Sequence, residues 1–266
     1  MLGYQSEVKI GLGTDFHLCT PTERKDRIKL TSSLGVLLEY LEKDSQLLGF
    51  LGDYSGLFGI FQLEYLLSNQ IQWFGVLGNH DLDKYNSNFN GTQFKREVID
   101  RSYINLTGLL DGEHIPEGLV EISPGKIYGR QEGNVFVVYT HVPLDFRTEL
   151  SGEILKNIRG NKLGVILAGH THHKNPVIHM AYVEDTPILQ FELPPFLRRV
   201  TGGKMEAPAS LFELVVKDDS VELRQVYLAR SHTNGVRVRE KPIVRYCLRD
   251  YGQISTARMS WGVLVC

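Results

Sequence analysis

The stretch Trp73-Phe74-Gly75-Val76-Leu77-Gly78-Asn79-His80-Asp81 decides the fold, because an apolar run gives way directly to an amide, an imidazole and a carboxylate. A strand that ends in this way places its polar side chains at one edge of a sheet, where a ligand can reach them. Taken alone, Gly78-Asn79-His80-Asp81 is equally typical of an ordinary loop in which Asn and Asp form turns. Similar stretches elsewhere in the chain decide between these two interpretations.

Upstream of this stretch, two further apolar runs lead to carboxylates. The run at residues 8–12 leads to Asp15 and His17, and the run at residues 47–51 leads to Asp53. Side chains two positions apart in extended backbone point to the same side, so Asp15 and His17 can hold one ion. These runs favour a ligand site over an ordinary loop.

Downstream, two more apolar runs lead to imidazoles. Residues 134–139 end at His141, and residues 164–168 end at His170 and His172. The pair at 170 and 172 repeats the two-residue spacing of Asp15 and His17. Five predicted strands are therefore each followed by side chains that could bind a metal ion.

The order of elements predicts an α/β protein. Helices are expected at about residues 20–43 and 57–67, so the chain begins strand, helix, strand, helix, strand, which is typical of parallel strands joined by crossovers. Residues 82–134 form a loop-rich insert, with a helix at about 93–100, which we expect to shape a substrate pocket. A β-rich part follows from about residue 186, with strands expected at residues 188–191, 211–216 and 221–228, and Asp218-Asp219 as a hairpin turn.

Composition excludes several classes of protein. Hydrophobic residues make up 42% of the 266 residues and charged residues 23%, as in soluble globular proteins. The formal charge of −2 gives no general reason to expect polyanion binding. Three widely spaced cysteines indicate reduced thiols, and no run has membrane-spanning length or the pattern of a signal peptide. We expect a soluble, cytoplasmic protein.

The candidate ligands carry only oxygen and nitrogen donors. They are Asp15, His17, Asp53, Asn79, His141, His170 and His172. Seven donors are too many for one tetrahedral ion and suit two ions that share a bridging carboxylate. Donors without a thiolate suit Mn²⁺, Fe or Zn²⁺.

In chain order, the blocks D-x-H, G-D, G-N-H-D, H and G-H-x-H resemble the calcineurin-like metallophosphoesterase superfamily. The resemblance uses residues from 15 to 172 and implies a four-layer αββα sandwich of two mixed sheets flanked by helices. It also implies two divalent metal ions, with Mn²⁺ expected first, at the carboxyl ends of the strands. No internal repeat or low-complexity linker divides the sequence, so we expect a single domain over residues 1–266.

The resemblance further implies a role for each site residue. One ion would be held by Asp15, His17 and His172. The other would be held by Asn79, His141 and His170. Asp53 would bridge the two ions. His80 would assist the leaving group, and Asp81 would orient His80. His173 and His179 match no position of the family pattern, and we expect them to be structural or exposed.

The implied activity is hydrolysis of a phosphodiester, either small or derived from a nucleotide or lipid, by a metal-bound hydroxide. A phosphomonoesterase or a nuclease of the same superfamily is the alternative. For a nuclease, Arg237, Arg239 and Arg245 could contact the nucleic-acid backbone, although nucleic acid is not the favoured substrate. A non-catalytic scaffold is the least favoured interpretation, because every ligand and His80 are present.

Overall fold

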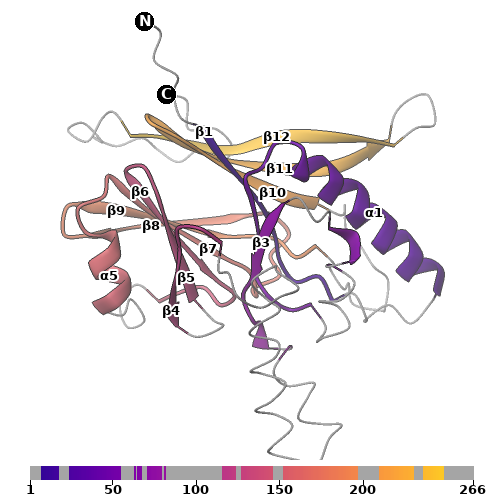
Figure 1. Cartoon of the computed structure of the whole chain (residues 1–266), viewed down its shortest axis with the longest axis horizontal. Coiled ribbons are helices and arrows are strands. Elements are labelled where there is room, and N and C mark those ends of the chain that lie inside the picture. The colour runs from indigo at the N-terminus through magenta and orange to yellow at the C-terminus, as the bar shows by residue number, and fades with distance from the viewer. Residues whose placement is uncertain are drawn as a thin grey trace, which may run out of the picture.

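The computed structural model describes residues 7–17, 24–54, 63, 65–67, 71–79, 81, 116–123, 127–145, 152–196, 210–230 and 236–248, without the side chains of residues 24–29 and 230. Within this part of the chain, two six-stranded sheets are accompanied by helices α1 (Arg24–Glu42) and α5 (Gly152–Ile158). Figure 1 shows the long helix α1 beside one sheet and the short helix α5 beside the other.

Sheet A has the strand order β12-β11-β10-β1-β2-β3. Its strands are β1 (Glu7–Gly13), β2 (Leu47–Phe50), β3 (Gln72–Gly75), β10 (Ser210–Lys217), β11 (Ser220–Arg230) and β12 (Val236–Cys247). Strands β1, β2 and β3 are parallel, as their order with α1 predicts, whereas β10, β11 and β12 are added antiparallel beside β1. The predicted hairpin turn at Asp218-Asp219 is confirmed, because Lys217 pairs with Ser220.

Sheet B has the strand order β4-β5-β6-β7-β9-β8. Its strands are β4 (Leu119–Ser123), β5 (Ile127–Glu132), β6 (Val135–Thr140), β7 (Leu163–Ala168), β8 (Val177–Val183) and β9 (Thr186–Glu192). Strands β6, β7 and β9 are parallel, and β5, β4 and β8 pair antiparallel. Strands β4 and β5 lie within the predicted insert, whereas residues 82–115, with the helix expected at 93–100, are outside the described residues.

The main hydrophobic core lies between the two sheets. It joins side chains from sheet A, such as Leu12 and Phe74, to side chains from sheet B, such as Tyr139 and Phe191. The rings of Phe74 and Tyr139 meet edge to face, with centroids 4.8 Å apart. Full burial of one such side chain contributes about 1.5–3 kcal/mol, so this core holds the two sheets together.

Each helix packs on the outer face of one sheet. The leucines of α1, including Leu34 and Leu41, pack against Leu48 of β2, and Ile154 of α5 packs against Ile166 of β7. Gly11 of β1 leaves room for this packing, because a Cβ atom there would lie 2.4 Å from Leu48 Cδ2 of β2 and 3.1 Å from Leu41 Cδ1 of α1. The prediction of two mixed sheets is confirmed. The four-layer sandwich stays a prediction, because both ends of a helix are given for only two helices, α1 and α5, in the described residues.

Two further observations bear on the expectations from composition. None of the helices in the described part of the chain is long and apolar enough to span a membrane. Cys247, at the end of β12, is disulfide-bonded, which corrects the prediction of three reduced thiols. Widely spaced cysteines gave no sequence signal for this bond, because a pairing depends on the distance between residues in the folded chain.

Candidate metal centre

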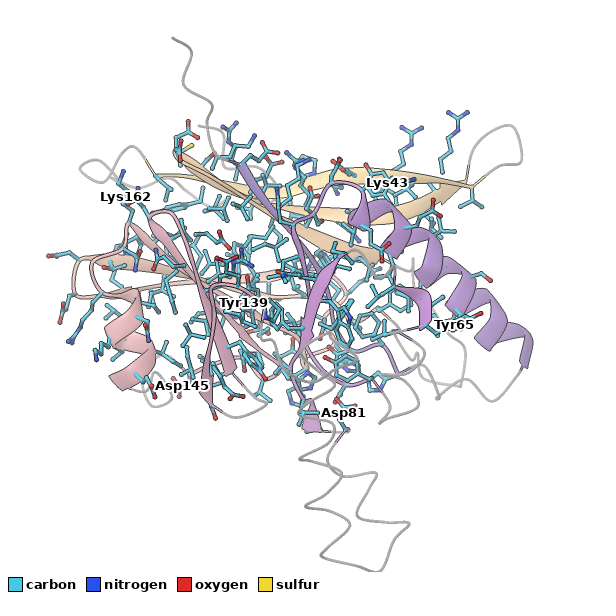
Figure 2. The ribbon with its side chains drawn as sticks, in the orientation of Figure 1. Lys43, Tyr65, Asp81, Tyr139, Asp145 and Lys162 are labelled. Atoms are coloured by element: carbon cyan, nitrogen blue, oxygen red, sulfur yellow. The ribbon has the colours of Figure 1, made fainter. Side chains whose placement is uncertain are left out.

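The candidate ligands follow strands whose carboxyl ends meet at one edge of the fold. In Figure 2, Asp81 lies at the lower end of the molecule, whereas Lys43, which precedes β2, lies at the upper end. Within sheet A, the Asp15 N–H donates to Gly52 O at 3.0 Å. Between the sheets, the His170 N–H donates to Asp15 Oδ2 at 3.0 Å. The loops therefore form one connected surface across both sheets.

One group of ligands gathers around Asp15. Single donor atoms of Asp15, His17, Asp53 and His172 all lie within 4.8 Å of one another. His172 Nε2 is 2.9 Å from Asp15 Oδ1 and 3.4 Å from His17 Nε2. An ion about 2.0–2.2 Å from each donor would separate any two of them by at most about 4.4 Å, so the group needs little closure to hold one ion.

A second group gathers around Asn79. The Oδ1 atom of Asn79 is 3.1 Å from His141 Nε2 and 3.1 Å from His170 Nδ1. His141 Nδ1 lies 2.6 Å from the carbonyl oxygen of Leu51, which can only accept, so Nδ1 carries a proton and donates it. Nε2 of a neutral His141 therefore faces Asn79 with a lone pair, and a proton or a cation is needed between the two atoms.

Asp53 lies between the two groups. Its Oδ2 atom is 3.8 Å from His17 Nε2, and its Oδ1 atom is 3.5 Å from His141 Nε2. The side chain is buried, so its negative charge needs partners of opposite charge nearby. One carboxylate thus presents one oxygen to each group of donors.

Five of the seven candidate ligands have an unusual backbone. The φ angles of Asp15, His17, Asp53, His170 and His172 lie between 44° and 68°, in the left-handed region. Such a conformation costs about 1–3 kcal/mol for a residue other than glycine and persists where the surrounding structure enforces it. The ligand loops are therefore strained into position, which the sequence did not indicate.

Three glycines let the loops approach closely. A Cβ atom on Gly169 would lie 1.9 Å from Thr14 Oγ1, and one on Gly78 would lie 2.2 Å from Asp53 Oδ1. A Cβ atom on Gly52 would lie 2.7 Å from His141 Nδ1, and its φ of 87° also favours glycine. The backbone at residues 52, 78 and 169 thus approaches the candidate ligands and their neighbours so closely that only glycine fits there.

The electrostatics of the centre favour the charged form of Asp15. Burial raises the pKa of Asp15, but hydrogen bonds from His172 and Thr14 and the charge of His141 outweigh it, and the net pKa is lowered. The hydrogen bond to Asp15 raises the pKa of His172 despite its burial. Burial lowers the pKa of His141, but contact with Asp53 and the charge of Asp15 raise it overall. Because the pKa values of His141 and His172 are raised, protons compete with a cation for these two imidazoles.

The imidazole of His170 behaves differently from those of His141 and His172. Burial lowers the pKa of His170, and the neighbouring charge of His141 lowers it further. The centre therefore combines carboxylate oxygens with imidazole nitrogens, each of which can bind either a proton or a cation. This donor set fits divalent cations.

Two neighbours of the ligands hold the loops in place. The Thr14 hydroxyl lies 2.7 Å from Asp15 Oδ2 and 3.1 Å from Leu51 O, a role that sequence reasoning missed because threonine there carries no motif signal. Asp81 accepts hydrogen bonds from the backbone N–H groups of Asp53, Tyr54 and Gly78 at 2.8, 2.9 and 2.9 Å. Asp81 therefore ties the loop after β2 to the loop after β3, in addition to any role toward His80.

The other histidines separate into two groups. His80 and His114 lie outside the described residues. His173 and His179 are half-exposed, as expected, but both contact the buried carboxylate of Glu192, which sequence reasoning did not single out. The seven predicted ligands are thus brought together, and two further histidines share a separate carboxylate.

These observations define a candidate metal centre built from loops at the carboxyl ends of parallel strands. The family model of the calcineurin-like phosphoesterases matches residues 8–174. This match spans more than half of the chain, so the chain belongs to the calcineurin-like phosphoesterase family. No curated protein matches the sequence.

Several solved structures resemble the chain at low identity. A predicted phosphoesterase from Streptococcus pneumoniae is 11% identical, covering 89% of this chain and 98% of that one, with a TM-score of 0.42. Vps29 from Entamoeba histolytica complexed with Zn²⁺ is 14% identical, covering 88% and 99%, with a TM-score of 0.43. Vps29 from Chaetomium thermophilum is 12% identical, covering 90% and 97%, with a TM-score of 0.42. Likenesses of this degree do not define an activity.

Proposed function

We propose that this chain is a metal-dependent phosphodiesterase that hydrolyses a small phosphodiester. The observation that carries the proposal is the Asp53 carboxylate, which presents Oδ1 to His141 at 3.5 Å and Oδ2 to His17 at 3.8 Å. A carboxylate with one oxygen toward each of two donor groups is suited to bridge two cations. The proposal includes the four-layer arrangement, with α1 and α5 as the outer layers.

The two donor groups would each hold one divalent ion. We assign Asp15, His17 and His172 to the first ion and Asn79, His141 and His170 to the second, with Mn²⁺ as the expected metal and Fe or Zn²⁺ as alternatives. The His141 Nδ1–H bond to Leu51 O fixes the ring so that Nε2 faces the second site. Burial and strain keep the donors in place before substrate arrives.

Two divalent ions in such a centre supply charge that neutralises the phosphate and lowers the pKa of a water at the site. The side chains and loops of the protein keep the donors charged and in position. Asp15 stays ionised because its pKa is lowered by its partners despite its burial. Asp81 holds the loops after β2 and β3 together through its three backbone contacts. The strained loops aim their donors at a common point, which keeps the centre in one arrangement.

His80 is the proposed proton donor to the leaving group. It stands in the chain between Asn79 and Asp81, and both of these neighbours belong to the centre. An imidazole that protonates a leaving alkoxide or phenoxide contributes about 10²–10⁴ in rate. Substitution of His80 should therefore lower kcat while the bound metal is kept.

The charges of the described site favour a diester over a monoester. The donor groups consist of carboxylate, amide and imidazole, with neither lysine nor arginine among the donors themselves. A monoester carries more negative charge than a diester and is commonly met by arginine. A singly charged phosphodiester suits this centre better.

The position of the basic strand disfavours nucleic acid as the substrate. Arg237, Arg239 and Lys241 are exposed on β12, which is the edge strand of sheet A opposite to β3. At the usual spacing of neighbouring strands, β12 is about 14 Å from β1 and about 24 Å from β3. A nucleic-acid backbone bound along β12 would therefore contact the protein well away from Asn79 and Asp81.

A substrate panel tests the proposal. The Mn²⁺-loaded protein is compared on an aryl phosphodiester, an aryl phosphomonoester, a cyclic nucleotide, a dinucleotide and single-stranded DNA, each at two salt concentrations. We expect the highest kcat/KM on a small diester, with weak dependence on salt. A preference for the monoester would contradict the proposal, and so would cleavage of DNA whose affinity falls with a log–log salt slope of about −0.7 per phosphate contact.

The variant Arg237→Ala/Arg239→Ala/Arg245→Ala separates the nuclease from the small-diester enzyme. These side chains lie on β12, away from the candidate ligands. A small-diester enzyme should keep its kcat/KM in this variant. A loss of DNA cleavage with unchanged hydrolysis of the aryl diester would instead assign the basic strand to nucleic acid.

A further inference from the structure

The face of the β11–β12 hairpin that is turned toward sheet B changes character along the hairpin. At one end, Leu223 of β11 and its partner Val244 of β12 are buried in the core between the sheets. Side chains alternate between the two faces of a strand, so every second residue continues this face. Beyond a shift in register after Leu223, the residues of this face are Gln225, Tyr227 and Ala229 on β11 and their partners Lys241, Arg239 and Arg237 on β12. These six residues are partly or fully exposed, so in the described part of the chain sheet B covers only the first part of the face.

Three cations follow one another along the exposed part of β12. Arg237, Arg239 and Lys241 occupy alternate positions, which in a strand places them in one row with a spacing of about 6.6 Å. Among the described residues, no carboxylate forms an ion pair with any of the three. In Figure 2, side chains with nitrogen at their tips project from the pale yellow β12 ribbon on the side away from α1. This part of the hairpin therefore presents a row of uncompensated positive charge.

The acidic side chains of the same hairpin lie on its other face. Glu240 stands between two of the three cations in the chain, yet it accepts a hydrogen bond from the Tyr40 hydroxyl of α1 at 2.7 Å and pairs with Arg224 at 3.6 Å. Glu222 also pairs with Arg224, at 2.8 Å. The hairpin thus separates its charges by face, although the whole chain has a formal charge of only −2.

Strand β12 is also an edge strand. It pairs with β11 and, within the residues that the structure describes, with no other strand. Alternate residues of an edge strand direct their backbone N–H and C=O groups away from the sheet, where a further strand can pair with them. A row of cations opposes pairing with a second copy of the same strand, because like charges would face each other across the new ladder. The edge therefore selects its partner strand by charge.

We propose that the exposed part of β12 binds an extended acidic segment of a partner protein, which adds to sheet A as a further strand. A strand beside β12 has the same rise per residue, so carboxylates at its alternate positions lie opposite Arg237, Arg239 and Lys241. Opposite charges that face each other across neighbouring strands stabilise the pairing. A nucleic acid neutralises the charges but cannot continue the ladder of the sheet, so a peptide fits both features of β12.

Fluorescence anisotropy with a labelled synthetic peptide tests this surface in the full-length protein. The probe alternates Glu and Val over about seven residues, the length of an ordinary strand. We expect the wild type to bind this probe. In Arg237→Ala/Arg239→Ala/Lys241→Ala the affinity should fall by about tenfold, because three cross-strand charge pairs are lost.

Two controls separate strand pairing from attraction between net charges. Lys156→Ala/Arg159→Ala/Lys162→Ala removes the same number of exposed cations from the region of α5, and it should bind the probe like the wild type. A peptide of the same sequence with methylated backbone nitrogens keeps every charge but cannot donate to the edge of a sheet. It should bind the wild type about tenfold more weakly than the unmethylated probe.

Reversal of the charges makes the test two-sided. Arg237→Glu/Arg239→Glu/Lys241→Glu should reject the acidic probe and bind the corresponding Lys–Val peptide instead. Absence of probe binding by the wild type would overturn the inference, and so would equal binding of the methylated and unmethylated peptides or unchanged affinity in the alanine variant. Tighter binding of single-stranded DNA than of the probe would also overturn it and assign the row to nucleic acid. None of these results measures hydrolysis, so failure of this surface and failure of the proposed activity are distinguished.

Discussion

The carboxylate of Asp81 accepts a hydrogen bond from the backbone N–H of Asp53 at 2.8 Å. This contact joins the loop after β3 to the loop that carries the proposed bridging ligand. The same carboxylate also binds the N–H groups of Tyr54 and Gly78. The position of the bridging ligand therefore depends on a residue that need not touch metal or substrate.

Asp81→Asn should destabilise the protein and weaken its metal centre. The variant keeps the shape of the side chain, but its amide nitrogen is a donor that faces backbone donors. Leaving a buried N–H unsatisfied costs about 1–3 kcal/mol, which urea unfolding of the metal-free protein should detect. Metal affinity should fall as well. Unchanged stability and affinity would show that the three backbone contacts do not position the loop.

Gly169→Ala should disrupt the ligand loop after β7. The added methyl group would lie 1.9 Å from Thr14 Oγ1 and 2.6 Å from Asp15 Oδ2. Asp15 belongs to the first donor group, and the Thr14 hydroxyl donates a hydrogen bond to it. We expect a loss of metal affinity of at least tenfold, measured by competition with a chelating dye. Gly152→Ala is the control, because no atom lies within 4 Å of the added Cβ, and it should bind metal like the wild type. Equal affinities in the two variants would contradict this account.

The metal-free and metal-loaded proteins should respond to pH in opposite directions. The hydrogen bond to Asp15 raises the pKa of His172 above its usual 6.5. This contribution to stability is fully present below pH 6.5 and is lost as the pH rises through the folded pKa. Metal binding needs the neutral imidazole, so metal affinity should rise over the same window.

Thermal unfolding at pH 6 and pH 8 checks this prediction, once with a chelator and once with Mn²⁺. The gain in Tm on adding Mn²⁺ should be larger at pH 8. A larger gain at pH 6 would show that protons and cations do not compete for the same donors.

Glu213→Gln should stabilise the protein near neutral pH. Glu213 is buried on β10, and burial raises the pKa of its carboxyl group even though Arg224 lies 3.4 Å away. The stability that this group contributes is fully present below pH 4.5 and is lost as the pH rises through the folded pKa. The advantage of the glutamine variant should therefore grow from pH 4 to pH 7 in urea unfolding.

Glu39→Gln is the control for Glu213→Gln, because Glu39 is exposed on α1 and pairs only with Lys43 among the described residues. It should change stability by less than about 0.5 kcal/mol at either pH. An advantage of Glu213→Gln that shrinks as the pH rises would show that the ionised carboxylate is well compensated.

Sequence alone predicted the central strands and which candidate ligands lie together. Strands β1, β2, β3, β6 and β7 are buried on both faces, so they stand out as continuous apolar runs that end in polar residues. Strands β4, β5 and β8 were missed. Strands β4 and β8 are the two edges of sheet B, where partial exposure permits polar residues and weakens the pattern.

The details of the centre depend on contacts between residues that are far apart in the sequence, and no local sequence pattern predicts such contacts. The backbone contacts of Asp81 come from residues 28 and 27 positions earlier, and the contact of His170 with Asp15 spans 155 positions. The left-handed conformations at five ligands likewise arise because distant loops enforce them. Glu192 was missed for the same reason, since its partners are brought to it by the pairing of β8 with β9.

The most direct test of the central claim compares hydrolysis of an aryl phosphodiester by three samples: chelator-stripped protein, the same protein reloaded with Mn²⁺, and Asp53→Asn treated identically. The account predicts no turnover without metal, full recovery with Mn²⁺, and loss of both bound metal and rate in Asp53→Asn, because that carboxylate faces both donor groups. Undiminished hydrolysis by stripped, metal-free protein would contradict it.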